Sequence, residues 1–478
     1  MNTVLNLNSS SFLFYDYETF GIHPALDKPA QFACIRTDIN FNIIDTPNEF
    51  FCYPPIDYFP DPNAILITGI SPFYTRKYGS NEFEFASKIC NQFMQPNTCI
   101  IGYNNIHFDD EITRNVFYRN FIDPYEWSWK NGNSRWDILD VLRACYALRP
   151  EGINWPSGVH NYYPSFKLSD ISKSNGIIHD KAHSAISDVF ATLQITKLLK
   201  KIQPKLFDYF FKYRKKKELL KIIDIYNIKP MIYISRFFGS LRNNISYIAP
   251  ILWDPNNSNV LISIDLAKDI ESLLIYLSDV TIKAINYNYI FQKGIVLIHV
   301  NRCPILAPIN VIGIEDRLRL NINYEVCKKN LFLIRSSVFL KNKLKIINHK
   351  VPQLHLENVD LQMYNAFFGN LEKKLIKIIH VLLTKRSLNR RTLPILSNRI
   401  RLLLLRCIAR NYPHILNARE KLLWKKHCNV VVNSKSIYKY VKKILNLLEL
   451  NKNNSKKVSL LKDLLEYVHI IKRDIRNI

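Results

Sequence analysis

The chain has 478 residues, of which 47% are hydrophobic and 22% are charged, and its 66 Lys and Arg exceed its 40 Asp and Glu by 26. This length exceeds what one core usually organises, and the apolar content excludes a disordered chain, so we expect two or three domains. No run of about 18 apolar residues exists and the first eight residues lack a signal pattern, so we expect no membrane segment and no secretion. The basic excess favours a polyanionic partner.

The charge is unevenly distributed along the chain. Residues 1–190 hold 14 Lys and Arg against 21 Asp and Glu, whereas residues 191–478 hold 52 against 19. A general enrichment of the chain in Lys does not explain why residues 1–190 carry fewer basic than acidic side chains. The nine Cys residues form no CxxC pair and have no His at zinc spacing, so we expect reduced thiols in a cytoplasmic protein.

The first 200 residues alternate between strand and helix patterns. Ser11–Phe20, Ala30–Asp38 and Thr98–Gly102 are predicted strands, and a helix is expected near His183–Lys200. This alternation is typical of an α/β domain, which we place at residues 1–200.

The remaining chain changes character twice. Residues 201–352 contain the β-rich segments Met231–Phe238, Val260–Leu266 and Gly294–Val300, which predict a small β domain with accessory helices. From residue 357 to 478 the pattern is helical and basic, with predicted helices at Asn398–Arg410 and Ser434–Leu450.

The segment around Asp16 and Glu18 carries the first candidate site. Side chains of a strand alternate between its two faces, so these two carboxylates project to one face. Adjacent carboxylates beside an apolar strand repel each other unless a cation joins them, and hard oxygen ligands suit Mg²⁺ or Mn²⁺. An edge strand with its charged face in water is the alternative.

Two further segments favour the metal interpretation. Asp109 follows an apolar strand in a loop that opens a helix, although on composition alone Asp110 or Glu111 could serve equally. His183 and Asp188 stand five residues apart at the start of the apolar helix, and they could supply an imidazole and a fourth carboxylate to the same site.

These motifs, Asp-x-Glu-Thr, Asn-x-x-x-Phe-Asp and His-x-x-x-x-Asp in that order, resemble the DEDDh 3′→5′ exonucleases. Within them, FLFYDYETFGIHPALDKPAQFACIRTD, GYNNIHFDDEITRNVFYRNF and NSRWDILDVLRACYALRPEGINWP resemble the bacterial exodeoxyribonuclease I family. The resemblance is dense over residues 11–210 and continues through HVNRCPIL, DLQMYNAFF and ARNYP. It implies an α/β ribonuclease H-like exonuclease domain, an SH3-like β domain and an α-helical C-terminal domain that form a C-shaped clamp.

The resemblance also implies the chemistry. The family degrades single-stranded DNA processively from its 3′ end to 5′-mononucleotides in DNA repair and recombination. Asp16, Glu18, Asp109 and Asp188 would hold two Mg²⁺ ions, with Mn²⁺ as a possible substitute, and His183 would be the general base. Two ions can activate a water and stabilise the leaving oxygen, and a neutral imidazole can accept the proton of that water.

The basic region would supply phosphate contacts and aromatic rings would stack on bases. Among the basic and aromatic side chains, our predicted substrate contacts are Arg149, Trp127, Trp129, Lys215 and Arg399. Further candidates for phosphate contacts are Lys212, Arg214, Lys216, Lys217, Arg401, Arg406 and Arg410. For at least half of the rings between Phe117 and Trp136, we expect a place in the core instead.

The family also docks the acidic C-terminal tail of single-stranded-DNA-binding protein. Arg149, Tyr209, Lys229 and Arg335 occupy positions that the resemblance assigns to that pocket, whereas Pro308 and Gly313 stand where polar or basic residues would be expected. A clamp built from one chain needs no second subunit, so we expect a monomer. Two alternatives remain open at this stage: a DEDDh nuclease acting on RNA ends or proofreading products, and a DNA-binding clamp without turnover.

Overall fold

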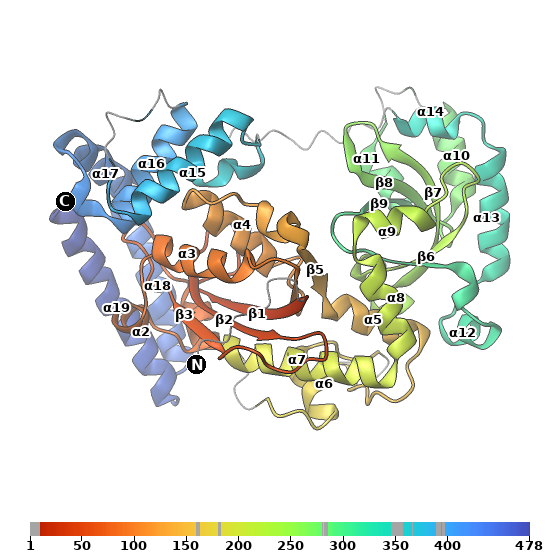
Figure 1. Ribbon diagram of the computed structural model, residues 1–478, viewed down its shortest axis with the longest axis horizontal. Helices are drawn as coiled ribbons and strands as arrows, with labels where there is room; N and C mark the ends of the chain where they lie inside the picture. Colours follow the sequence, from red (N-terminus) through yellow and green to blue (C-terminus); the bar gives the residue numbers. More distant parts are fainter. Residues whose placement is uncertain are drawn as a thin grey trace. The chain divides into compact units, whose positions relative to one another are not determined.

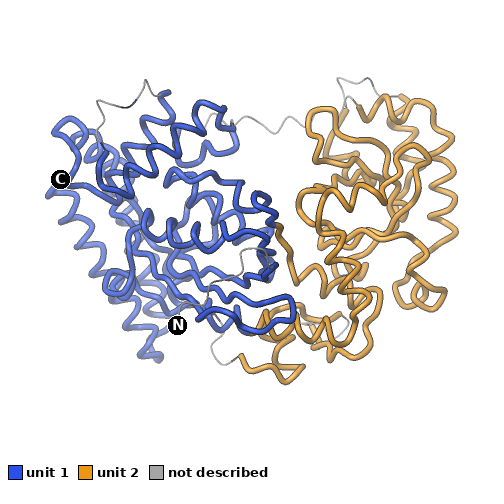
Figure 2. Tube along the Cα trace, in the orientation of Figure 1, with its two compact units in different colours: residues 1–133, 180–190, 353–478 blue, residues 134–179, 191–352 orange. Residues whose placement is uncertain are grey.

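The computed structural model describes residues 10–158, 163–179, 183–279, 281, 285–345, 357–365, 367–388, 393 and 397–478. The chain divides into two compact units (Figure 2). Unit 1 comprises residues 1–133, 180–190 and 353–478, and unit 2 comprises residues 134–179 and 191–352. Within the described ranges, none of the helices has the length and apolar character needed to cross a membrane.

Unit 1 is built on a β-sheet whose strands lie in the order β3-β2-β1-β4 (Figure 1). Strand β1 pairs antiparallel with β2 and parallel with β4. The strand bounds are β1 (Ser11–Thr19), β2 (Pro29–Thr37), β3 (Asn48–Phe51) and β4 (Thr98–Gly102). The three strands predicted in this region are therefore confirmed, with shifts of one residue at their ends.

The alternation along β1 separates a core face from a polar face. Leu13, Tyr15 and Tyr17 are buried in a cluster with side chains of helices α3 and α4. Asp16 and Glu18 occupy the alternate positions, so the tyrosines anchor the strand while the carboxylates face away from that cluster. The helices that follow in this segment are α1 (Pro62–Thr68), α2 (Pro72–Tyr78), α3 (Glu82–Phe93) and α4 (Asp109–Arg119).

The C-terminal helices belong to the same compact unit as this sheet. They are α15 (Asn370–Thr384), α16 (Asn398–Asn411), α17 (Ala418–Val431), α18 (Ser434–Leu450) and α19 (Ser455–Arg476). Phe83, Tyr118 and Phe121 share one core with Ile408 and Tyr467. The sequence pattern placed residues 357–478 in a separate domain, but a helical pattern does not reveal which distant surface its apolar face covers.

A buried ionic network joins these two parts of unit 1. The Arg410 guanidinium contacts a carboxylate oxygen of Asp57 at 2.7 Å and one of Asp360 at 2.6 Å. Arg406 contacts Asp360 at 3.1 Å, and His427 Nε2 lies 3.1 Å from Asp57. We call these five residues the Arg410 network. Burial raises the pKa of both carboxyls, but the charge of Arg410 outweighs it and lowers both pKa values below the usual range.

Unit 2 contains an antiparallel sheet in the order β10-β6-β7-β8-β9. Its strands are β6 (Met231–Ile234), β7 (Ile245–Asp254), β8 (Asn257–Asp265), β9 (Ile295–His299) and β10 (Ile305–Pro308). Phe238 and Leu306 are among the buried side chains of its core. The predicted strand Met231–Phe238 is too long, because Ser235 caps a 3₁₀ turn that ends the strand at Ile234.

Unit 2 contains further elements besides this sheet. They are β5 (Ser134–Asp137), α5 (Ile138–Leu148), α6 (Leu168–Ser174), α8 (Pro204–Tyr213), α9 (Lys216–Leu219), α10 (Ile270–Asp279), α11 (Tyr287–Gln292), α12 (Ile314–Arg319), α13 (Tyr324–Ser336) and α14 (Leu340–Lys345). Helix α7 (Ala185–Ile202) begins in unit 1 and continues in unit 2.

Candidate active site

The site begins with the two carboxylates of β1. Glu18 is 8% exposed, and Asp16 stands two residues earlier on the same strand face. Burial, followed by the neighbouring charges of Asp188 and Asp109, raises the pKa of Glu18 to about 8. For Asp16, burial and then the charges of Asp109, Glu18 and Asp188 raise the pKa well above its usual value. The four carboxyls therefore form one electrostatically coupled group, which we call the Asp16 cluster.

The structure distinguishes Asp109 from its neighbour Asp110. The backbone N–H of Tyr17 donates to Asp109 Oδ1 at 3.2 Å, which ties Asp109 to β1 between the two cluster residues of that strand. Asp110 is fully buried and instead accepts from the Tyr15 hydroxyl at 2.5 Å and from Asn105 Nδ2 at 3.3 Å. Asp109 thus belongs to the cluster, whereas Asp110 holds the loop before α4 against β1.

The start of α7 completes the site. Ligand atoms of Glu18, His183 and Asp188 all lie within 4.8 Å of one another. His183 is exposed and has a backbone φ of 65°, which is the left-handed region that a non-glycine residue rarely adopts. The three sequence segments predicted to form the site therefore lie together, because β1, the start of α4 and the start of α7 all contribute side chains to it.

This donor set fits a divalent cation. Carboxylate oxygens are the ligands that Mg²⁺ and Mn²⁺ prefer. Burial among like charges disfavours the ionised carboxylates of Asp16 and Glu18, and a bound cation would reverse that penalty. The raised pKa values therefore describe a group of acids that needs positive charge to ionise fully.

Comparison with known proteins assigns the chain. Family models match residues 13–196 (Exonuclease), 214–349 (Exonuclease I SH3-like domain) and 357–471 (Exonuclease I C-terminal domain). The exodeoxyribonuclease I of Buchnera aphidicola subsp. Baizongia pistaciae is 54% identical, with 98% of this chain and 97% of the relative covered. That of Escherichia coli is 46% identical, with 97% and 98% covered. The chain belongs to the exodeoxyribonuclease I family.

Solved structures of exonuclease I share the fold, among them two of the E. coli protein with DNA. The complex with a dA16 oligonucleotide has a TM-score of 0.89 at 44% identity, covering 97% of this chain and 100% of the other. The complex named SSB/Exonuclease I with the inhibitor CFAM has a TM-score of 0.90 at 43% identity, with the same coverage. The zinc-bound complex with single-stranded DNA has a TM-score of 0.88 at 43% identity, covering 97% and 99%. The predicted fold class of an exonuclease domain, an SH3-like domain and a helical C-terminal domain is confirmed.

The aromatic residues predicted to stack on bases separate into two groups in this exodeoxyribonuclease I family member. Trp129 is 61% exposed, so its ring is accessible. Trp127 is 1% exposed, its ring centroid lies 4.9 Å from that of Phe93, and its indole N–H donates to the carbonyl of Pro124. Trp127 is therefore a core residue, and its predicted contact with a base is wrong. Five of the seven rings from Phe117 to Trp136 are buried, which confirms that most of this stretch is core. The five are Phe117, Tyr118, Phe121, Trp127 and Trp136.

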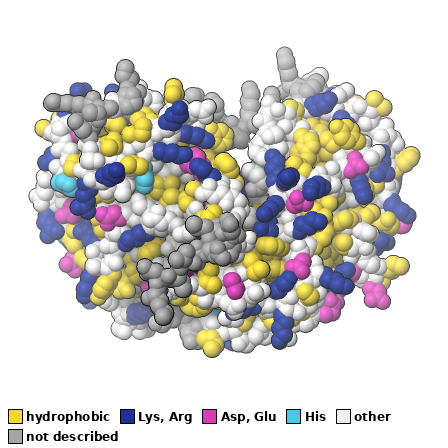
Figure 3. All heavy atoms as spheres, in the orientation of Figure 1, with side chains coloured by type: hydrophobic (Ala, Val, Ile, Leu, Met, Phe, Trp, Pro, Cys, Tyr) yellow, Lys and Arg dark blue, Asp and Glu magenta, His cyan; other side chains and the backbone are white. Residues whose placement is uncertain are grey.

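Several predicted phosphate contacts are already engaged with carboxylates. Arg399 lies 3.2 Å from Glu372 and its guanidinium is over the Phe368 ring, while Arg406 and Arg410 belong to the Arg410 network. A guanidinium that neutralises buried carboxylates has little capacity left for a phosphate, so Arg410 in particular is a structural residue. Lys215 is exposed. On the face drawn in Figure 3, Lys and Arg side chains are spread over both units.

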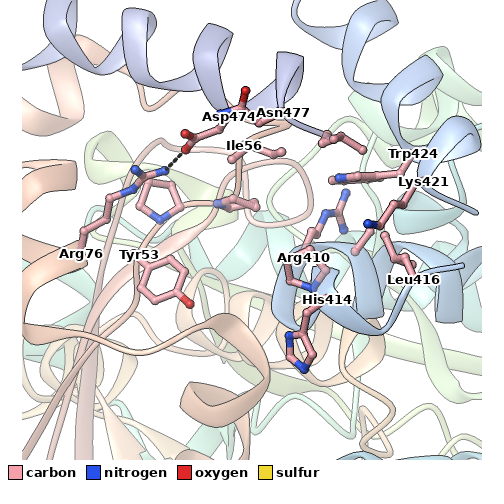
Figure 4. Close-up of a pocket in the computed structure, with 15 residues that line it drawn as sticks. Tyr53, Ile56, Arg76, Arg410, His414, Leu416, Lys421, Trp424, Asp474 and Asn477 are labelled. Carbon is pink, nitrogen blue, oxygen red and sulfur yellow. Dashed lines mark hydrogen bonds and ion pairs between the residues drawn. The ribbon is translucent and has the colours of Figure 1, made fainter. Parts of the chain in front are cut away.

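A cavity of about 660 Å³ lies in unit 1 next to the Arg410 network. Figure 4 shows Arg76, Arg410, His414 and Lys421 around it, with Arg76 paired to Asp474. None of its 15 lining residues is a predicted catalytic residue. Arg410 is paired with Asp57 and Asp360, and no carboxylate of the Asp16 cluster lines this cavity.

The residues predicted to dock a partner tail lie in unit 2. Arg149 and Tyr209 line a pocket of about 310 Å³ together with Lys205 and apolar side chains. Arg149 donates to the carbonyl of Val311 and lies 3.8 Å from Asp316. The Arg335 guanidinium donates to the carbonyls of Asn227 and Ile228, which directly precede the exposed Lys229. Arg335 and Lys229 therefore form a second group, outside the lining of that pocket.

Sequence reasoning passed over one buried polar residue beside the site. Gln31 of β2 is 4% exposed and stands opposite Glu18 in the sheet register. It interrupts an otherwise apolar strand segment, Pro29–Ile35, and that interruption is the signal that could have found it.

Proposed function

We propose that this chain hydrolyses single-stranded DNA processively from its 3′ end to 5′-mononucleotides, as a 3′→5′ exodeoxyribonuclease that serves DNA repair and recombination. The observation that carries this proposal is the convergence of Glu18, His183 and Asp188 within 4.8 Å beside Asp16 and Asp109. The named complex of E. coli exonuclease I with a dA16 oligonucleotide supports the choice of substrate.

Each residue of the site has a role in this proposal. Asp16, Glu18, Asp109 and Asp188 would hold two Mg²⁺ ions, with Mn²⁺ able to replace them. When bound, these ions would polarise the scissile phosphate and lower the pKa of the attacking water. An imidazole nitrogen of His183 accepts the proton of that water, and the exposure of this ring gives it access to the substrate.

The surrounding contacts keep this machinery in place. The Tyr17 N–H donates to one oxygen of the Asp109 carboxylate and so fixes this carboxylate against β1. Buried Tyr15 fixes Asp110 and thereby the loop from which Asp109 emerges. Exposed Trp129 and Lys215 remain candidates for contacts with bases and phosphates, as do the other predicted contacts Arg149, Lys212, Arg214, Lys216, Lys217 and Arg401.

The pocket of Arg149 and Tyr209 supports a second part of the proposal, in which it binds the acidic C-terminal tail of single-stranded-DNA-binding protein. A pocket lined by a guanidinium and apolar side chains suits a peptide carboxylate that carries an apolar side chain. The structure named SSB/Exonuclease I supports this choice. Lys229 and Arg335 extend the basic surface of unit 2 in the same proposal. We further propose that the protein acts as a cytoplasmic monomer.

The decisive experiment measures nucleotide release from 3′-terminated single-stranded DNA, blunt duplex DNA and RNA, with Mg²⁺ or with chelator. We expect metal-dependent release from single-stranded DNA only. His183→Ala should lower kcat by about 10²-fold or more near neutral pH, because a general base contributes that much. Glu449→Ala, at an exposed carboxylate of α18 outside the site, is the control.

Three outcomes would contradict the proposal. Metal-independent hydrolysis would remove the role of the cations, and equal attack on RNA would favour an RNA-directed enzyme. Tight DNA binding without any turnover would favour a DNA-binding clamp. For the partner, Arg149→Ala should weaken the binding of the tail peptide, whereas Lys173→Ala, at an exposed lysine of α6, should not.

A further inference from the structure

Gln31 links the strand that carries Glu18 to the helix that carries Asp188. Its Nε2 donates to Glu49 Oε1 at 2.5 Å, and its Oε1 accepts the backbone N–H of Ala185 at 3.1 Å. Ala185 is the first residue of α7, and all three residues lie in unit 1. A single side chain on β2 therefore bridges β3 and the start of α7.

The chemistry of the two partners fixes the orientation of the Gln31 amide. A backbone N–H can only donate, so Ala185 requires the amide oxygen. The ionised carboxylate of Glu49 can only accept, so it requires the amide NH₂ group. The two bonds are therefore mutually consistent, and Glu49 ensures that the oxygen of Gln31 is presented to α7.

The bridge lies at the point where α7 needs an external partner. The first N–H groups of a helix have no acceptor within the helix, and Gln31 supplies one to Ala185. His183 precedes this anchor by two residues and has a left-handed backbone, which persists only when its surroundings hold it. Asp188 follows three residues later, and its N–H donates to the carbonyl of Ser184 in the first turn of the helix.

The register of the sheet explains why this anchor acts on the site. Gln31 is the direct cross-strand partner of Glu18, and Ala33 is that of Asp16, so Gln31 projects from the same sheet face as both carboxylates. Glu49 pairs with Ala33 on the next strand. One row of side chains thus leads from the carboxylates of β1 to the start of α7.

We propose that Gln31 is a positioning residue for the reaction, because it sets the distance of His183 and Asp188 from Asp16 and Glu18. Gln31 acts through Ala185 and through no contact with substrate. The proposal rests on the function proposed above, since it assigns His183 and Asp188 to the same reaction.

The primary test is Gln31→Met, which keeps a similar shape and removes both hydrogen bonds. We expect kcat to fall by about 10- to 100-fold, the range seen when a residue that orients a metal ligand is lost. The KM for single-stranded DNA should change by less than about twofold, because the interaction lost is not a substrate contact. Mn²⁺ binding to the protein without DNA, measured by calorimetry, should weaken by about 10-fold as Asp188 loses its position.

Asn81→Ala is the matched control in the same unit. Asn81 is also a buried amide that accepts a backbone N–H at a helix start, that of Glu84 in α3, and donates a second bond, to the carbonyl of Asn411. It should lower the Tm without lowering kcat or Mn²⁺ affinity, because α3 carries no residue of the site. A loss of kcat in Gln31→Met that matches the loss in Asn81→Ala at equal Tm would overturn the proposal.

Variants at Glu49 test the amide orientation and leave Gln31 in place. Glu49→Gln is conservative, since its own side-chain oxygen can accept from Gln31, and kcat should stay within about twofold of wild type. Glu49→Lys offers only donors, turns the Gln31 oxygen away from Ala185 and should lower kcat by about fivefold or more. Full kcat in both Gln31→Met and Glu49→Lys overturns the positioning role. Wild-type protein that lacks metal-dependent hydrolysis would instead overturn the proposed function.

Discussion

Unit 1 buries two groups of carboxylates whose acidities move in opposite directions. In the Asp16 cluster, burial and mutual repulsion raise the pKa of Asp16 well above its usual value and that of Glu18 to about 8. In the Arg410 network, burial acts in the same direction, but Arg410 outweighs it and the pKa of Asp57 and Asp360 is lowered. Glu18 is 8% exposed, Asp57 7% and Asp360 5%, so burial alone does not distinguish a site carboxylate from one in a structural contact.

The difference lies in where the compensating positive charge comes from. The Arg410 network carries its cations within the chain, and it joins the N-terminal segment to the C-terminal helices. The Asp16 cluster consists of like charges supplied by β1, α4 and α7, and a divalent ion is the partner that suits it. The direction of the pKa shift thus separates carboxylates that suit an external cation from carboxylates that are paired with a cation of the chain.

Loss of a cluster carboxylate should produce the largest effect. Asp16→Asn removes a proposed metal ligand worth several kcal/mol in the transition state, so kcat should fall by at least about 10³-fold. The same change removes an acid whose ionisation is disfavoured by burial and by the neighbouring carboxylates, so the Tm in chelator should stay equal or rise. Nucleotide-release kinetics and thermal unfolding measure the two effects. A variant that loses activity only because its Tm falls would contradict the assignment.

Loss of the network cation should affect stability instead. Arg410→Met leaves Asp57 and Asp360 buried without their main partner, which should cost about 3–5 kcal/mol in the free energy of unfolding measured with urea. The kcat of the folded protein should be unchanged. If the variant instead kept its stability and showed a raised KM for DNA, Arg410 would be a phosphate contact after all.

The pH dependence of stability should separate the two groups. In chelator, the folded protein holds the Glu18 proton up to about pH 8, whereas the unfolded chain releases it near pH 4.5. Raising the pH through this window therefore favours unfolding, and the Tm contribution of this group falls. Asp57 and Asp360 have lowered pKa values, so their contribution is complete above about pH 4 and is lost only on further acidification.

Thermal scans of wild type and Glu18→Gln between pH 4.5 and 8 measure this difference. The variant should lack the part of the slope that comes from Glu18. Saturating Mg²⁺ should raise the wild-type Tm more at pH 8 than at pH 5, because metal binding requires ionised carboxylates. An equal Mg²⁺ effect at both pH values would contradict the coupling between protons and metal.

The smallest effect should come from the edge of the Arg410 network. His427 Nε2 lies 3.1 Å from Asp57, but its side chain is 23% exposed and Arg410 still neutralises the carboxylate. His427→Gln should therefore cost about 0.5–1.5 kcal/mol in urea unfolding, the usual contribution of one hydrogen bond. A cost equal to that of Arg410→Met would show that the imidazole carries the network.

Strand periodicity and motif spacing are local properties, and together with the family resemblance they predicted the five residues of the candidate site. The period of two placed Asp16 and Glu18 on one face, and the start of α7 was predicted within two residues. On composition alone Asp109 and Asp110 were equal candidates, and the family resemblance selected Asp109. The structure adds that Tyr15 reaches Asp110 across the core.

Contacts between distant segments were beyond the sequence pattern. Nothing local distinguishes buried Trp127 from exposed Trp129, or Arg410 with its partners Asp57 and Asp360 from an arginine free to bind phosphate. For the same reason, the pattern that predicted a helical C-terminal domain at residues 357–478 did not show that its apolar side chains share a core with Phe83 and Tyr118. The left-handed backbone of His183 is only weakly signalled by its residue type, because His adopts this region more often than most residues but still rarely.

The discontinuity of unit 1 has a consequence for biosynthesis. Residues 1–133 and residues 353–478 build one core, but about 220 residues of the chain separate them. At a synthesis rate of about 5–20 residues per second, the ribosome needs roughly 10–45 s to pass from one part to the other. During that interval Phe83, Tyr118 and Phe121 have no native partners from the C-terminal helices, so the nascent N-terminal segment presents an apolar surface that chaperones can bind.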